Sequence, residues 1–186
     1  MRFLKCTQFL LIMAVLFSLV VVGCDTKTPE MTDPSFKGPQ VVANPKEVPL
    51  GVASLMGMEM VIEGAGFRPR DTVLIWLIGE KDIKIPIANA KVGEDGTFSV
   101  KFGKSLQDSV VKVSEILKAG MRTNEKSQTV LVITQEPIPK GSYKLRAENV
   151  IEPQTAETSV ELVDPPFTGR IKDSLGKMLG KIEDKR

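Results

Sequence analysis

The sequence predicts an all-β protein, a sandwich over residues 41–164, and two observations support this. Short segments alternate between apolar and polar residues, which is the pattern of strands with one face in a core and the other in water. Clusters of turn-forming residues separate these segments, and several short strands spaced in this way are typical of a sandwich. The alternating segments are centred on Met60, Ile75, Val100, Leu145 and Val160, and the turns are Gly64-Ala65-Gly66, Glu94-Asp95-Gly96 and Pro137–Gly141.

The glycine pair at Gly64 and Gly66 is predicted to turn the chain rather than to bind a nucleotide. A dinucleotide-binding loop needs a further glycine three residues after Gly66, where a helix begins. That position holds Pro69, and residues 72–78 have the pattern of a strand. We therefore expect both glycines to lie where a side chain would clash at a strand end, and Phe67 to close that end of the core.

Three ordered motifs carry a family resemblance: Gly64-x-Gly66-Phe67-x-Pro69 followed by Asp71-x-Val73, then Asp95-Gly96-Thr97-Phe98, then Pro139-x-Gly141-x-Tyr143. They resemble the bacterial immunoglobulin-like modules of secreted and surface proteins. The resemblance covers residues 40–163 and implies an antiparallel immunoglobulin-like sandwich without a common catalytic site. Arg70 departs from the pattern, because such modules often have glycine there, and an insertion follows Phe102.

The insertion is predicted to contain a short amphipathic helix over residues 105–119. Ser105 and Asp108 resemble a capping box, and Gly120 fits a C-cap. The helix either forms a binding element or packs on the sheet, and we favour packing as a lid over Trp76. The residues at helical spacing are Leu106, Val110, Val113 and Leu117.

A second amphipathic helix is expected over residues 165–186, after Pro165-Pro166. Residues 170–186 contain six basic and three acidic side chains. The helix either frays or docks on the sandwich, or it lies on anionic lipid as an interfacial helix. The apolar residues at helical spacing are Phe167, Ile171, Leu175, Met178, Leu179 and Ile182.

The N-terminus has the pattern of a lipoprotein signal peptide over residues 1–23. Arg2 and Lys5 precede an apolar run from Phe9 to Val22, which is short for a membrane span. The run ends in Val21-Val22-Gly23-Cys24, which resembles a bacterial lipobox. The resemblance implies cleavage before Cys24, acylation of its thiol and a bilayer as the first partner.

Residues 24–40 are predicted to be the lipidated N-terminus and a flexible tether, because they are rich in Pro, Thr, Asp and Lys. Asp25 resembles the signal that retains proteobacterial lipoproteins in the inner membrane. In such an organism the domain would face the periplasm.

The composition removes several classes of function. The chain has no histidine, and therefore no histidine triad and no histidine metal ligand. Without Arg2 and Lys5, 23 basic residues balance 23 acidic residues, so no overall basic field attracts nucleic acid. We expect no nucleic-acid partner and no cofactor.

Two surface candidates remain. Met56, Met58 and Met60 carry thioethers of the kind that bind Cu(I), although strand alternation would aim Met58 and Met60 at the core. Leu74, Trp76 and Ile78 are predicted to face outward and form a possible interface. We expect a membrane-anchored envelope lipoprotein that acts as a noncatalytic interaction or structural module with an envelope protein partner. A small-molecule or copper-binding lipoprotein is the alternative, and an enzyme comes third.

Overall fold

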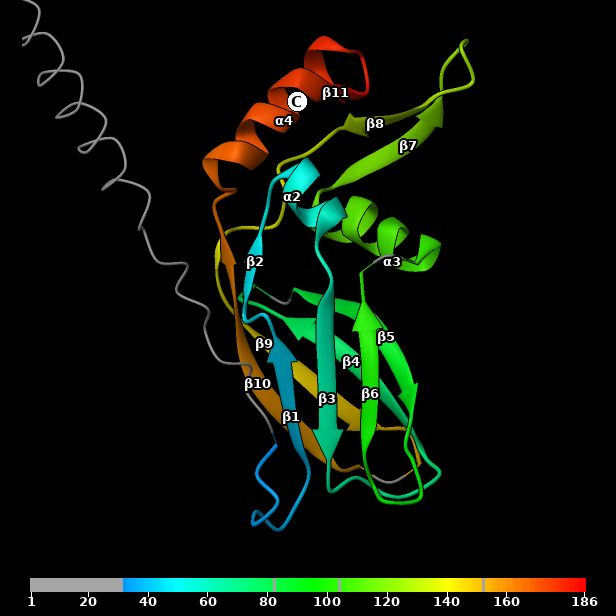
Figure 1. Ribbon diagram of the computed structural model, residues 1–186, viewed down its shortest axis with the longest axis vertical. Helices are drawn as coiled ribbons and strands as arrows, with labels where there is room; N and C mark the ends of the chain where they lie inside the picture. Colours follow the sequence, from blue (N-terminus) through cyan, green and yellow to red (C-terminus); the bar gives the residue numbers. More distant parts are fainter. Residues whose placement is uncertain (1–31, 82, 104, 152) are drawn as a thin grey trace, which may run out of the picture.

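The computed structural model describes residues 32–81, 83–103, 105–151 and 153–186, and two stacked sheets form its larger part (Figure 1). One sheet has the order β1-β3-β6, and the other has the order β2-β10-β9-β4-β5. Strand β2 pairs parallel with β10, and the other neighbours are antiparallel. The predicted all-β sandwich is confirmed. Its strands are β1 (Gln40–Asn44), β2 (Glu47–Pro49), β3 (Met60–Ala65), β4 (Thr72–Ile78), β5 (Lys84–Lys91), β6 (Phe98–Phe102), β9 (Gly141–Asn149) and β10 (Thr155–Val163).

Strand β4 has the predicted register. Val73, Ile75 and Leu77 are buried in the core, and the residues between them are more exposed. Phe98 and Phe102 of β6 belong to the same core cluster. A shift of one residue would instead bury Leu74, Trp76 and Ile78 and turn the three core residues outward.

Gly64 and Phe67 close one end of the sandwich as predicted. A Cβ atom on Gly64 would lie 2.2 Å from the Phe98 ring, so only glycine fits there. The Phe67 ring is buried and meets Phe98 edge to face, with ring centroids 5.3 Å apart. Gly66 has a φ of 76°, a conformation that glycine adopts readily.

Tyr143 explains the motif Pro139-x-Gly141-x-Tyr143. Its hydroxyl donates a hydrogen bond of 2.9 Å to the carbonyl oxygen of Pro139. A tyrosine near the start of a strand that bonds back to the preceding backbone is a feature of immunoglobulin-type sandwiches. Arg70, which stands where the resemblance expects glycine, has a φ of 65° and so adopts the left-handed conformation that glycine favours.

The inserted helix begins as predicted but ends early. Helix α3 (Leu106–Val111) has the capping box at Ser105 and Asp108, and the π-helical turn η1 (Lys112–Ile116) follows. Gly120 is not the C-cap but lies in strand β7, and Lys118 takes the left-handed conformation, with a φ of 52°.

The lid prediction is also corrected. Val113 and Leu117 are buried in the core of the sandwich, whereas Leu106 and Val110 are exposed. The helix lies across the end of the sandwich (Figure 1). Its buried side chains thus join the inner side of β4, and Trp76 is on the outer side.

A smaller third sheet lies at this end of the molecule, with strand order β11-β8-β7. The hairpin of β7 (Ala119–Thr123) and β8 (Thr129–Ile133) follows the inserted helix, and β11 (Ile182–Asp184) pairs parallel with β8. Helix α4 (Phe167–Met178) packs against α2 (Val52–Gly57) and β11. The predicted C-terminal helix over 165–186 is therefore too long. Helix α4 ends where the backbone N–H of Gly180 donates to the carbonyl oxygen of Lys177 and that of Lys181 donates to the carbonyl oxygen of Gly176. Strand β11 follows.

Candidate interaction surface

The predicted lipidation residue Cys24 and the sorting residue Asp25 lie outside the described residues. No helix in the described part of the chain is long and apolar enough to cross a bilayer.

The three methionines of the predicted copper site do not share one strand face. Met56 lies in α2, Met58 follows that helix, and Met60 is buried in β3. Met58 and Met60 line the same apolar core cavity, which has a volume of about 20 Å³ and also touches Phe102 and Ile116. The structure thus brings together two of the three thioethers. Among the described residues, no group of three or more Cys, Asp or Glu side chains could hold a metal ion.

The predicted face of Leu74, Trp76 and Ile78 points away from the core, as expected. Trp76 is half-buried because neighbouring strands cover it: Lys84 places its ammonium 4.3 Å from the ring centroid, and Arg146 is its neighbour on β9. The indole Nε1 is buried, and no side chain or backbone group of the described residues accepts a hydrogen bond from it. This face is therefore partly covered by long cationic side chains.

Lys112 is a buried residue that the sequence analysis missed. Its side chain is inaccessible to water, and its ammonium donates to the carbonyl oxygens of Met58 at 2.9 Å and Gly103 at 2.7 Å. Burial lowers the pKa of Lys112, and the charges of Asp108 and Glu59 oppose this effect. The side chain ties the π-helical turn to the ends of two strands, which is a structural role.

Helix α4 docks on the protein with its small side chains. A Cβ on Gly169 would lie 2.2 Å from the Ser54 hydroxyl, and one on Gly176 would lie 2.7 Å from the Ile182 side chain. The two glycines are seven residues apart, and so lie on one side of the helix. They let the backbone of α4 approach both α2 and β11 closely.

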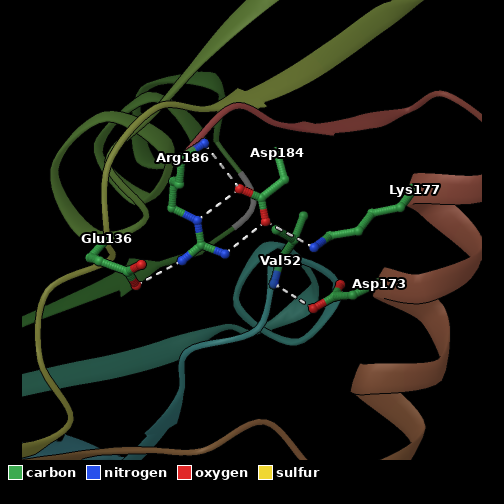
Figure 2. Close-up of polar contacts among 6 residues, drawn as sticks. All are labelled: Val52, Glu136, Asp173, Lys177, Asp184 and Arg186. Carbon is green, nitrogen blue, oxygen red and sulfur yellow. Dashed lines mark hydrogen bonds and ion pairs between the residues drawn. The ribbon is translucent and has the colours of Figure 1, made fainter.

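Asp173 lies between these glycines and completes the docked side. Its carboxylate accepts a hydrogen bond of 3.0 Å from the backbone N–H of Val52 (Figure 2). It accepts a second, of 2.7 Å, from the backbone N–H of Ala53. These groups are the free donors at the start of α2, which has no cap from its own N-cap residue, Gly51. Asp173 lies 120 residues after Ala53 in the chain, so no local sequence motif predicts this cap.

Ion pairs hold the C-terminus beside α4. The Arg186 guanidinium donates to both carboxylate oxygens of Asp184, at 2.8 and 2.7 Å, and also reaches Glu136 at 2.7 Å (Figure 2). Lys177 of α4 pairs with Asp184 at 3.0 Å. The hydrogen bonds from Arg186 and Lys177 hold the pKa of Asp184 well below its usual range.

The opposite side of α4 carries its large apolar side chains, and these face solvent. They are 45% to 80% exposed, and they are Phe167, Ile171, Leu175, Met178 and the adjoining Leu179. At about 100° per residue, this apolar side is centred roughly 140° from Gly169 and Gly176. We call these five residues the exposed apolar face. Arg170, Lys172 and Lys177 lie at its two margins, and the only acidic residue of the helix, Asp173, is on the docked side.

Comparisons with known proteins give no family. No family model and no curated protein matches the chain. Among solved structures, macromomycin aligns with 68% of this chain and 100% of its own, at 7% identity and a TM-score of 0.39. A tetra-tandem repeat in the extending region of a large adhesion protein aligns with 68% of this chain and 24% of its own, at 11% identity and a TM-score of 0.34. Likenesses this distant carry no argument about function.

Proposed function

We propose that this chain is a bacterial envelope lipoprotein, attached to a membrane through acyl chains on Cys24, whose sandwich acts as a noncatalytic interaction or structural module. The lipobox-like segment Val21-Val22-Gly23-Cys24, after a short apolar run and two positive charges, is the observation that carries the proposal. Two or more acyl chains hold a protein on a bilayer durably, since each buried methylene contributes about 0.8 kcal/mol.

The remaining parts of the proposal follow from this anchor. If the source is a proteobacterium, Asp25 favours the inner membrane with the domain in the periplasm. The partner would be another envelope protein, and no nucleic acid or cofactor is needed. A β-sandwich supplies a stable display scaffold rather than a fixed active site, so the fold is compatible with a noncatalytic role.

Fatty-acid labelling tests the anchor. Cells that express the chain are fed an alkyne fatty acid, and the purified protein is assayed for label. We expect strong labelling of the wild-type chain and of the control Cys6→Ala, which changes a thiol within the predicted signal peptide. Cys24→Ala should lose the label and accumulate as the longer precursor. Equal labelling of Cys24→Ala and wild type would contradict the proposal.

Copper binding is the second candidate, because Met58 and Met60 line one cavity. Titration of the purified protein with Cu(I) tests this alternative against a role in the core. The main proposal expects no stoichiometric binding, and it expects Met58→Leu/Met60→Leu to keep the fold, since the side-chain volumes are nearly equal. Tight binding that this double variant loses would favour copper.

A further inference from the structure

From the geometry of α4 we infer that this helix lies on an anionic lipid bilayer, with its exposed apolar face in the headgroup region. The contact would be a second attachment besides the acyl chains on Cys24. The inference rests on the proposed function in one respect only, namely that the anchor brings the domain to a membrane. It concerns a surface that the anchor does not include.

The first step of the argument is that α4 cannot bury this face by turning over. Gly169, Gly176 and Asp173 already hold the other side of the helix against α2 and β11. A rotation about the helix axis would break the two hydrogen bonds that Asp173 accepts and would push larger side chains against Ser54 and Ile182. The fold therefore holds the apolar side chains in the direction of solvent.

The second step is the chemistry of the exposed side. It combines aromatic and aliphatic side chains with basic residues at both margins, Arg170 and Lys177 on one side and Lys172 on the other. Helices that lie in the plane of a membrane interface have this arrangement. Phosphate headgroups would meet the basic margins. Lys177 is shared with Asp184, which offsets part of its charge.

The third step compares the possible occupants by area and charge. A helix of 12 residues is about 18 Å long and 10–12 Å wide, so its face covers about 200 Å². A stable protein interface needs about 800 Å² on each partner. Two copies of this helix would also bring their basic margins together. An anionic bilayer satisfies both the apolar face and the charges, and it needs no minimum area because the acyl anchor already provides attachment.

The fourth step is the position of the anchor. The first described residues lie at one end of the long axis, and α4 lies at the other (Figure 1). Cys24 is eight residues before Thr32, a stretch that spans at most about 28 Å. Attachments at the two ends would hold the long axis of the domain along the bilayer. The acyl anchor alone would leave the domain free to reorient.

Photocrosslinking of the full-length chain in its native membrane tests the inference. Benzoylphenylalanine replaces Phe167 or Leu175 on the exposed apolar face, or Leu106 as a control, because Leu106 is an equally apolar residue that is 80% exposed on α3. After irradiation, mass spectrometry measures whether the tryptic peptides that contain these positions have gained the mass of a phospholipid. The peptide that contains Cys24 is separate, so its acyl chains do not interfere.

We expect phospholipid adducts at Phe167 and Leu175, at least five times more abundant than at Leu106. Ile171→Glu should reduce the adduct at Leu175 about tenfold without changing the melting temperature. In vesicles, the adduct should fall at least threefold when phosphatidylglycerol is replaced by phosphatidylcholine, or when Arg170→Gln and Lys172→Gln are combined.

A crosslink at Phe167 and Leu175 to another protein or to a second copy would overturn the inference, as would the absence of any lipid adduct at both positions. Fatty-acid labelling of Cys24 in the same cells keeps the two proposals apart. Lipid adducts at α4 without fatty-acid label on Cys24 would reject the anchor and support the bilayer contact. Label on Cys24 without adducts at α4 would support the anchor and reject the bilayer contact.

Discussion

The sandwich and the C-terminal unit, by which we mean α4 and β11, are held to the molecule in opposite ways. In the sandwich, large apolar side chains such as Ile75 point into the core, and strands such as β10 turn charged side chains outward. In α4, glycines and a carboxylate point inward, and the large apolar side chains face water. Hydrophobic burial thus stabilises the first region. The second is attached by close backbone approach, a shared helix cap and ion pairs, together with the pairing of β11 to β8 and one buried side chain, Ile182.

The largest expected difference between the two regions comes from one substitution made in both. Ile75 is 0% exposed and Ile171 is 45% exposed. Ile75→Ala should lower the free energy of unfolding by about 2–5 kcal/mol, because it removes apolar contacts and leaves a cavity. Ile171→Ala should change it by less than about 0.5 kcal/mol, since nearly half of the side chain is already in water and alanine favours helix. Urea denaturation measures both, and equal losses would refute the contrast.

A smaller effect is expected at the cap that joins α4 to α2. Asp173→Ala removes the acceptor for the N–H groups of Val52 and Ala53, and should lower stability by about 1 kcal/mol. Asp173→Asn keeps an oxygen acceptor and serves as the matched control, with a loss of a few tenths of a kcal/mol. If both variants are as stable as the wild type in urea, the cap does not attach the helix.

The smallest effect is a pH dependence at the C-terminus. Hydrogen bonds from Arg186 and Lys177 depress the pKa of Asp184 below the usual aspartate value of 3.8. The stabilisation is therefore fully present above about pH 4 and is lost as the pH falls below that value toward the folded-state pKa. Thermal unfolding between pH 6 and pH 2.5 should show a smaller acid loss for Asp184→Asn than for the wild type. Equal slopes would mean that the ion pairs contribute nothing, as is common for exposed pairs.

The sandwich could be predicted from the sequence because the pattern of most strands shows which of their two faces is buried. When apolar and polar residues alternate along a strand such as β10, only one face can enter the core, and the register follows. The clash at Gly64 and the closing role of Phe67 were also local enough to predict.

The docked side of the C-terminal unit could not be predicted, because helical spacing shows which residues share a face and not which face contacts the protein. The sequence analysis assigns no role to the glycines of α4, yet Gly169, Asp173 and Gly176 form the docked side. A small-residue stripe opposite an apolar one was the available signal. The partners in α2 lie more than 100 residues away, and no local pattern connects them.

The inserted helix illustrates an intermediate case. Its start was predicted because the capping box at Ser105 and Asp108 is local. Its end was not, because the π-helical turn coincides with Lys112, whose ammonium bonds to carbonyl oxygens on two other segments. Such contacts between segments far apart in the sequence leave no local pattern from which the end of the helix could be predicted.

Hydroxyl-radical footprinting of a chain that begins at Thr32, in solution without lipid, tests the central claim most directly. Met and Phe residues occur in both regions, so each serves as a matched pair. Met178 and Phe167 are 80% and 76% exposed, and Met60 and Phe98 are 4% and 5% exposed. We expect Met178 and Phe167 to be oxidised at least five times faster than their core counterparts. Equal protection of all four would contradict an outward-facing apolar side of α4.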